Sequence, residues 1–276
     1  MLDFLSTMAA ASRSRVKAAK ARVRERELRH RVSALPKPAA WRQHPSGFDV
    51  IAEFKPRSPS AGEFPVASSY GVRERGADYA RGGAAAVSVL TEPGVFGGSL
   101  EALAGMASSC GLPCLRKDFL VDPYQVLEAR AYGAAGVLLI VRLLDCRLLA
   151  EMIAAAASLN LFVLIEAFDA EDLDRGSSAL QGANAVGLLG VNSRDLATLA
   201  VDASRHSDLA RRAPAGVLLV AESGIASAND SARVARLGYS AALVGVALMR
   251  AEDPAGLLET MIAAGREVTS QREFKR

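Results

Sequence analysis

Residues 136–165 read GVLLIVRLLDCRLLAEMIAAAASLNLFVLI and contain one strand–helix–strand unit. The apolar runs at its two ends, 136–141 and 161–165, are continuous rather than alternating, which is typical of strands buried on both faces. Between them, residues 146–158 have the length and composition of a helix. Two parallel strands joined by a helix therefore form the unit from which we expect the fold to be built.

The same unit recurs along the whole chain, and the starts of the apolar runs lie 23 to 37 residues apart. The predicted strands are Asp49–Phe54, Ala86–Thr91, Pro113–Arg116, Gly136–Val141, Leu161–Ile165, Ala185–Val191, Val217–Ala221 and Ala242–Val246. Helical stretches such as 124–132 and 227–237 stand between them. Eight such repeats predict an α/β fold of the (β/α)8 or TIM barrel type, which takes about 250 residues.

The chain has 276 residues, so the barrel leaves a segment over at its N-terminus. We expect residues 1–46 to form a helical extension, residues 47–270 the barrel, and residues 271–276 a C-terminal tail. The extension carries nine Lys and Arg residues between Arg13 and Arg31, which indicates a solvated helix on the outside of the fold. A doubly wound sheet is the competing architecture, but it would leave two strands unplaced, and no Gly-x-Gly-x-x-Gly turn follows the first strand.

Composition excludes several classes of protein. Half of the residues are hydrophobic and 23% are charged, which is unlike a disordered chain. No apolar run reaches the roughly 18 residues that span a bilayer, and the first residues do not resemble a secretory signal. Three cysteines are too few for a disulfide framework. We therefore expect a cytoplasmic protein that binds neither a membrane nor nucleic acid; a monomer is expected, with a homodimer left open.

Ionisable residues stand at the ends of five predicted strands, where the active site of a (β/α)8 barrel lies. They are Glu53, Lys55, Lys117, Glu166, Arg194 and Glu222. Charges that converge on one mouth must neutralise one another or a ligand. Three glutamates opposite two lysines leave the mouth close to neutral, which predicts opposed acid and base groups.

Neutral residues at the same strand ends complete the predicted site. Ser58, Ser88, Asn192 and Ser223 supply hydroxyl and amide groups. Gly224 follows the seventh strand, and Gly245 with Val246 follows the eighth, where barrels commonly bind phosphate through backbone N–H groups. No histidine stands at a strand end, and no Gly-x-x-x-x-Gly-Lys loop or nicotinamide fingerprint is present, so we predict no metal site and no cofactor. Cys110 and Cys114 flank a turn and are expected to be packed thiols.

Several motifs together resemble the indole-3-glycerol-phosphate synthase family. They are Ile-Ala-Glu-Phe-Lys-Pro-Arg-Ser-Pro-Ser at 51–60, Ser-Val-Leu-Thr-Glu at 88–92 with Phe-x-Gly-Ser at 96–99, Leu-Arg-Lys-Asp-Phe at 115–119, Gly-Val-Asn-x-Arg-Asp-Leu at 190–196 and Ala-Glu-Ser-Gly-Ile at 221–225. The resemblance extends from about residue 48 to residue 262. It implies a phosphorylated small-molecule substrate, 1-(2-carboxyphenylamino)-1-deoxyribulose 5-phosphate, and the products indole-3-glycerol phosphate, CO2 and water, as in tryptophan biosynthesis.

The resemblance also implies roles for the residues at the mouth. Lys117 is expected to protonate the substrate ketone, and Lys55 to pair with the substrate carboxylate. Glu166 is expected to act as acid or base in the dehydration, with Lys55 assisting the other transfer; the sequence leaves that division open. Glu53 and Glu222 would keep the two lysines protonated.

The remaining implied contacts are with substrate. Phe119 would pack on the anthranilate ring, and Asn192, Ser223, Ser88 and Arg194 would support binding. Ser58, Gly224, Gly245 and Val246 would hold the phosphate. Val246 replaces a hydroxyl or acidic residue that is common in the family, which removes a side-chain hydrogen bond but keeps the backbone N–H.

Two other functions are weighed against this one. A phosphoribosylanthranilate isomerase would have a cysteine and an aspartate at the ends of strands one and five, where Glu53 with Lys55 and Glu166 stand instead. A catalytically silent barrel would have lost part of the charged set, which is intact. A primary-pathway enzyme and a specialised duplicate remain alternatives.

Overall fold

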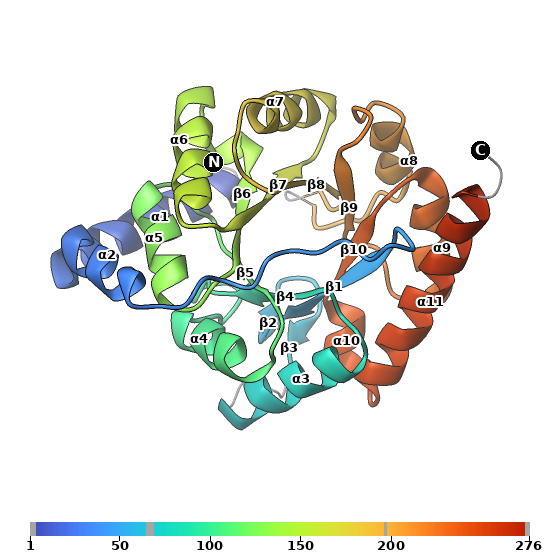
Figure 1. The fold of residues 1–276 in the computed structure, drawn as a ribbon, viewed down its shortest axis with the longest axis horizontal. Coiled ribbons are helices and arrows are strands. Elements are labelled where there is room, and N and C mark those ends of the chain that lie inside the picture. The colour runs from blue at the N-terminus through green and yellow to red at the C-terminus, as the bar shows by residue number, and fades with distance from the viewer. Residues whose placement is uncertain (1–3, 65–68, 196–197, 274–276) are drawn as a thin grey trace.

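The computed structural model describes residues 4–64, 69–195 and 198–273, and in them eight parallel strands close into a barrel in the order β1-β10-β9-β8-β7-β6-β5-β4 (Figure 1). The strands are β1 (Asp49–Phe54), β4 (Ala86–Leu90), β5 (Cys114–Lys117), β6 (Gly136–Ile140), β7 (Phe162–Ala167), β8 (Gly187–Asn192), β9 (Leu218–Glu222) and β10 (Ala241–Val244). Each overlaps a predicted run, so the predicted (β/α)8 fold is confirmed. A hairpin of β2 (Arg57–Ser58) and β3 (Gly62–Glu63), which the sequence did not predict, follows β1.

Helices surround the barrel and cover the outer faces of the strands (Figure 1). They are α3 (Ser69–Arg81), α4 (Leu100–Ser109), α5 (Pro123–Ala131), α6 (Cys146–Ser158), α7 (Ala170–Gln181), α8 (Ser204–Ala210), α9 (Ala228–Leu237), the short α10 (Val246–Arg250) and α11 (Pro254–Glu273), with a 3-10 turn at Val141–Leu143. Side chains one residue before several helices cap their first turns: Ser99, Asp145 and Ser227 each accept a backbone N–H from three residues on. The predicted domain boundary at residue 270 falls inside α11, and residues 274–276 of the predicted tail lie outside the described residues.

Strand side chains alternate between two apolar clusters. Residues such as Val50, Val87 and Val163 point outward and pack against the helices. Ile51, Leu115, Leu138, Leu164 and Leu243 belong to the cluster that fills the barrel. This alternation follows from the pleat of a strand, and it decides which residues at each strand end can reach the mouth.

The N-terminal extension has two parts with different contacts. Helices α1 (Phe4–Arg22) and α2 (Glu25–Ser33) lie against α5, and the segment after α2 runs across the barrel to β1 (Figure 1). In that segment Trp41 is buried, its ring 5.8 Å from that of Phe162 between centroids. Gly136 leaves space for the Phe162 ring, which any Cβ there would overlap. Residues near 41 therefore complete the barrel core, a contribution that the sequence did not indicate.

Candidate active site

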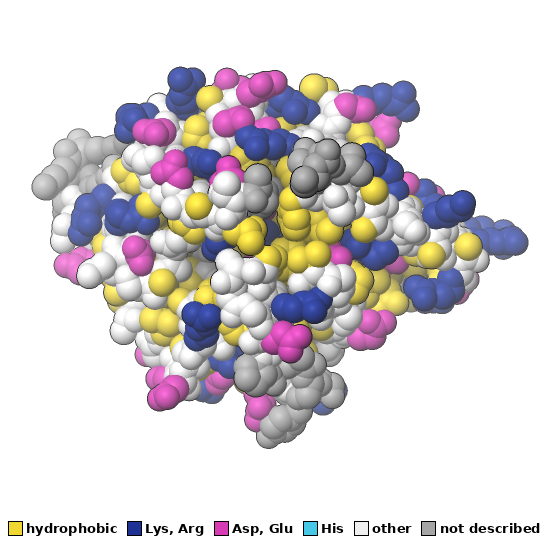
Figure 2. Space-filling view, turned by 180° about the vertical axis from the view of Figure 1, so that it is seen from behind, with side chains coloured by type: hydrophobic (Ala, Val, Ile, Leu, Met, Phe, Trp, Pro, Cys, Tyr) yellow, Lys and Arg dark blue, Asp and Glu magenta, His cyan; other side chains and the backbone are white. Residues whose placement is uncertain are grey.

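A cavity of about 550 Å³ opens among the C-terminal strand ends and the loops that follow them. This volume lies within the range of small-molecule sites. Figure 2, which views the molecule from the side opposite to Figure 1, shows the hollow near its centre with hydrophobic side chains around it. The cations that line it are Lys55, Lys117, Arg194 and Arg250, and the carboxylates are Glu53, Asp118, Glu166 and Glu222. The predicted convergence of opposite charges is therefore present.

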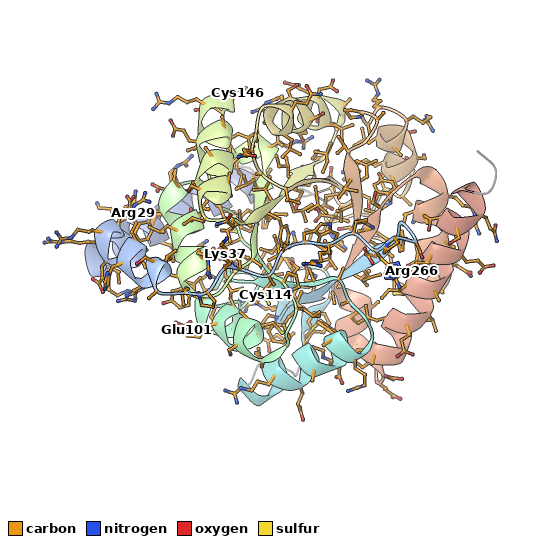
Figure 3. The ribbon with its side chains drawn as sticks, in the orientation of Figure 1. Arg29, Lys37, Glu101, Cys114, Cys146 and Arg266 are labelled. Atoms are coloured by element: carbon orange, nitrogen blue, oxygen red, sulfur yellow. The ribbon has the colours of Figure 1, made fainter. Side chains whose placement is uncertain are left out.

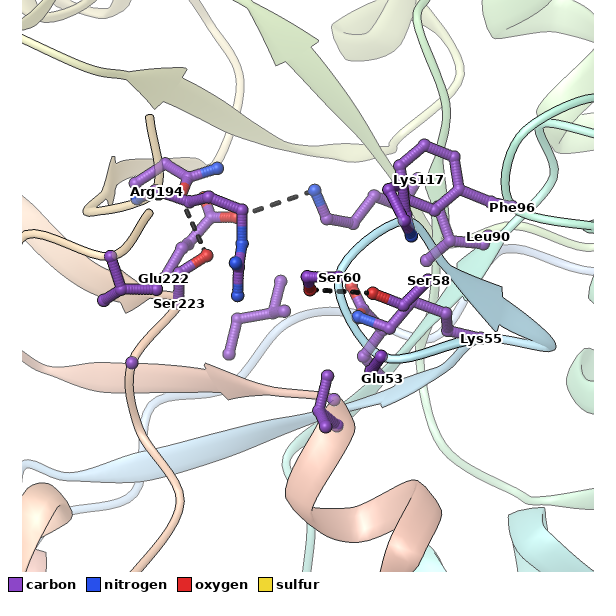
Figure 4. A pocket seen from close by; sticks show the side chains of 18 of the residues that line it. Glu53, Lys55, Ser58, Ser60, Leu90, Phe96, Lys117, Arg194, Glu222 and Ser223 are labelled. Atoms are coloured by element: carbon purple, nitrogen blue, oxygen red, sulfur yellow. Dashed lines mark hydrogen bonds and ion pairs between the residues drawn. The ribbon is translucent and has the colours of Figure 1, made fainter. Parts of the chain in front are cut away.

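Lys117, the last residue of β5, is the centre of the charged group. Its Nζ lies 3.1 Å from Oε2 of Glu166 and 3.7 Å from Oε2 of Glu222 (Figure 4). The side chains of the two glutamates are only 3% and 2% exposed, whereas that of Lys117 is 16% exposed. The ammonium group is therefore held between buried carboxylates and remains open to the cavity.

The surroundings set the protonation of this group. Burial by itself lowers the pKa of Lys117, but Glu166, Glu222 and Glu53 together outweigh burial and raise it above its ordinary value. Burial raises the pKa of Glu222 well above its usual range, and the charge of Glu166 adds to this, while Lys117 opposes it. Neither Glu222 oxygen has a hydrogen-bond partner in the described part of the chain. We conclude that Lys117 is protonated at neutral pH and that Glu222 takes up a proton more readily than an ordinary glutamate.

A second ion pair joins Glu53 of β1 and Lys55, which directly follows that strand. Burial raises the pKa of Glu53, but Lys55 and Lys117 have the greater effect and lower it below its ordinary value. Gly245, at the end of the neighbouring β10, leaves the space that this pair occupies, because a Cβ there would overlap the Glu53 carboxylate. Likewise, Gly190 leaves space for Glu222, because a Cβ at position 190 would overlap the Glu222 carboxylate. Both glycines thus make room for buried carboxylates at the mouth, a role that the sequence did not indicate.

Asn192 connects the carboxylates to the loop after β9. Its Nδ2 donates to Oε1 of Glu166 at 3.0 Å, and its Oδ1 accepts from Oγ of Ser223 at 2.9 Å and from the backbone N–H of Arg194, also at 2.9 Å. Ser223 has a φ of 66°, so this non-glycine residue occupies the left-handed region. The Arg194 side chain in turn donates to the carbonyl of Leu199 at 2.7 Å. This network fixes the direction of the Glu166 carboxylate.

The two opposite sides of the mouth differ in polarity. On the side of β4, β5 and β6 an apolar wall stands beside Lys117 and Asp118. It consists of Leu90, Phe96, Phe119, Leu138 and Ile140, with Phe4 from α1. The ring of Phe119 lies 5.9 Å from that of Phe4 and 6.1 Å from that of Phe96, measured between centroids. On the side of β9 and β10 the loops that follow Glu222 and Val244 contribute Ser223, Gly224, Gly245, Val246 and Ala247 to the lining. Since β7 and β1 lie between these sides in the barrel, Glu166, Glu53 and Lys55 stand between them.

Asp118 anchors the N-terminal helix to the strand that carries Lys117. Its carboxylate accepts from Arg15 at 2.7 Å, from Thr91 at 2.8 Å, from Arg116 at 3.3 Å and from the Phe119 backbone N–H at 2.8 Å. The Asp118 side chain is 1% exposed. Helix α1 is thus attached directly beside the mouth, although its charge suggested only a solvated helix.

The structure brings all but one of the predicted site residues to the cavity. Ser88 is the exception: it is fully buried, does not line the cavity, and its hydroxyl has no partner in residues 4–64, 69–195 and 198–273. Inward-facing residues of a strand recur at every second position, so Ser88 and Leu90 both face inward. Leu90 ends β4 at the level of Lys117 and reaches the mouth, whereas Ser88 lies two residues deeper in the barrel, at the level of Leu115. Phe4, Phe96 and Arg250 line the cavity but were not predicted to do so. Phe96 lies in the Phe-x-Gly-Ser motif at 96–99, whereas no motif in the sequence marks Phe4 or Arg250.

In the described residues, the His, Cys, Asp and Glu side chains form no group of three or more that could hold a metal ion. None of the described helices has both the length and the apolar character needed to cross a membrane.

A (β/α)8 barrel with opposed lysines and glutamates at its mouth defines an enzyme of the acid–base class. A family model described as indole-3-glycerol phosphate synthase matches residues 5–261. The chain is 43% identical over 219 residues to the indole-3-glycerol phosphate synthase of Kineococcus radiotolerans, covering 79% of this chain and 77% of the relative. It is 46% identical over 205 residues to that of Aromatoleum aromaticum, covering 74% and 76%. The chain belongs to the indole-3-glycerol phosphate synthase family.

Solved structures with low sequence identity share the fold. A 3-hexulose-6-phosphate synthase from Salmonella typhimurium matches with a TM-score of 0.60 at 14% identity, covering 80% of this chain and 99% of that one. Orotidine 5'-phosphate decarboxylase from Pyrococcus horikoshii matches with a TM-score of 0.58 at 10% identity, covering 79% and 98%. These likenesses show the barrel architecture alone.

Proposed function

We propose that the protein is an indole-3-glycerol-phosphate synthase, which converts 1-(2-carboxyphenylamino)-1-deoxyribulose 5-phosphate to indole-3-glycerol phosphate, CO2 and water. The observation that carries the proposal is the polarity of the mouth. Its aromatic wall on the β4–β6 side suits the anthranilate ring, and the glycine-containing loops after β9 and β10 suit the phosphate. The reacting atoms then lie between the two sides, beside Glu53, Lys55 and Glu166. The ammonium group of Lys117 extends from β5 to this region, since it lies 3.1 Å from Glu166.

Lys117 is the proposed acid for ring closure. When the aryl carbon attacks the ketone carbon, negative charge develops on the ketone oxygen. An alkoxide is more basic than a lysine amine, so a proton moves from Nζ to oxygen as the new bond forms. Three surrounding carboxylates keep Lys117 protonated before each turnover.

Lys55 is proposed to pair with the substrate carboxylate until CO2 leaves. Loss of CO2 returns its bonding electrons to the ring and restores aromaticity. Dehydration then needs an acid for the departing hydroxyl and a base for the ring N–H. Glu166, held by Asn192 at 3.0 Å and by Lys117 at 3.1 Å, is placed to carry out one transfer, and Lys55 to assist the other.

The phosphate is proposed to rest against Gly224, Gly245 and Val246, with Ser58 of β2 closing the site. All four residues line the cavity. Arg250, at the end of α10, adds a positive charge to this side and also donates to the carbonyl of Ala61 at 3.1 Å. We further propose that the enzyme acts as a monomer and lies in the cytoplasm.

The test is conversion of the carboxyphenylamino ribulose phosphate by the purified chain. Indole fluorescence should rise with release of one CO2 for each product molecule. Lys117→Met should abolish most of the signal, whereas Lys20→Met should not, because Lys20 lies on α1 and pairs with Asp122 outside the cavity. A folded parent chain that makes no indole product would refute the proposal.

A further inference from the structure

The turn between α4 and β5 contains two cysteines in the sequence Cys110-Gly-Leu-Pro-Cys114. Their Sγ atoms lie 3.6 Å apart. A disulfide needs about 2.05 Å, so the sulfurs have only a short distance to close. The third cysteine, Cys146, is exposed at the start of α6, far from this pair (Figure 3).

The local contacts distinguish the two thiols. The backbone N–H of Leu112 donates to Sγ of Cys110 at 3.4 Å. The thiol of Cys114, with this N–H, outweighs burial and lowers the pKa of Cys110 to about 7. The pKa of Cys114 is raised by the same hydrogen bond and by burial. Cys110 is therefore the nucleophile of the pair, since the thiolate is the reactive form.

The turn between the two cysteines reaches the surface at Gly111. Gly111 is exposed, has a φ of 69°, and a Cβ added to it would meet no described atom within 4 Å. Cys110 itself is 6% exposed and Cys114 only 1%. Both thiols are thus buried, and Cys110, next to the exposed Gly111, is the more accessible of the two.

We propose that Cys110 and Cys114 are a reversible dithiol–disulfide pair, oxidised by the disulfides of small thiols. The Cys110 thiolate attacks one sulfur of the oxidant, RSSR, and expels RS⁻, which takes up a proton. Cys114 then loses its proton and attacks Sγ of Cys110, releasing the second RS⁻. Two protein thiols are oxidised to one disulfide, and the oxidant is reduced to two molecules of RSH.

The crosslink would join the end of α4 to the first residue of β5. Lys117 stands at the opposite end of the same strand, so the proposal is independent of the proposed activity. A disulfide restricts the unfolded chain even when the loop is short, and the oxidised protein should unfold at a higher temperature than the reduced one.

The experiment uses the full chain with Cys146→Ser, so that thiol counts report only on the pair. After incubation with oxidised glutathione, we expect both thiols to be lost, the mass to fall by two hydrogen atoms, and peptide mapping to find the Cys110–Cys114 link. Dithiothreitol should restore both thiols. Cys114→Ser should instead retain glutathione on Cys110, because the resolving thiol is missing.

The parent chain supplies the control, since exposed Cys146 should react with glutathione under the same conditions. Two free thiols at positions 110 and 114 while Cys146 is modified would overturn the proposal. A stable glutathione adduct on Cys110 with Cys114 intact would overturn it equally, because it would show that Cys114 does not resolve the mixed disulfide. Both outcomes are read by mass spectrometry on the parent chain, so they do not depend on the folding of a variant.

Discussion

Replacing Lys117 with Met should change both rate and stability, and the structure indicates how much. The substitution keeps the length of the side chain and removes the ammonium group that lies 3.1 Å from Glu166 and 3.7 Å from Glu222. Loss of the proton donor for ring closure should lower kcat by about 10²–10⁴-fold. Breaking a buried ion pair costs about 3–5 kcal/mol, which corresponds to a fall of roughly 10 °C in Tm for a domain of this size.

The loss of stability should depend on pH. Without Lys117, the carboxylates of Glu166 and Glu222 face each other unpaired, and a proton must be taken up to relieve their repulsion. The pKa of Glu222 is already raised by burial and by Glu166, so the folded variant binds more protons than the unfolded chain above about pH 4.5. Its stability should therefore fall as pH rises from about 4.5 through the raised pKa of Glu222.

The assays are kcat from indole fluorescence and Tm from circular dichroism, at several pH values between about 5 and 8. Lys20→Met is the matched control and should leave both quantities nearly unchanged. A kcat within about tenfold of the parent would refute the assignment of Lys117 as the general acid. A Tm difference from the parent that stays constant with pH would show that carboxylate repulsion is not the cause of the instability.

Three further predictions test other parts of the molecule. Deleting residues 1–32 should leave a folded barrel, seen by circular dichroism, but raise KM because Phe4 leaves the cavity wall; a chain that unfolds would contradict this. Gly190→Ala should lower kcat by about tenfold or more by displacing the Glu222 carboxylate, with no further loss in a Glu222→Ala background; additive losses would show another cause. Burial lowers the pKa of His206 to about 4, so the free energy of unfolding should fall by about 1.4 kcal/mol per unit as pH drops from about 6.5 toward 4. His206→Gln should flatten that slope in urea titrations, and an unchanged slope would show that His206 is not the source of the pH dependence.

The barrel and much of its mouth could be predicted because their signals are local. Continuous apolar runs such as 136–141 indicate strands buried on both faces without knowledge of their neighbours. Parallel strands in a closed barrel all end on one side, so residues as distant as Lys117 and Glu222 could be assigned to one site from their positions alone. The boundaries were less well defined: β9 ends at Glu222 rather than Ala221, because strand pairing with Asn192 extends past the apolar run.

The tertiary structure alone decided which residues contact one another across long stretches of chain. Ser88 and Leu90 are equally plausible mouth residues in sequence, and only the register of β4 places Leu90 at the cavity. Packing between segments far apart in the chain places Trp41 under the barrel, Phe4 in the cavity wall and Arg15 on Asp118. The space that Gly190 leaves for Glu222 likewise exists only once β8 lies beside β9. The periodicity of a sequence shows which residues of one segment are buried and which are exposed to solvent. The contacts named here form only when several segments pack together in three dimensions.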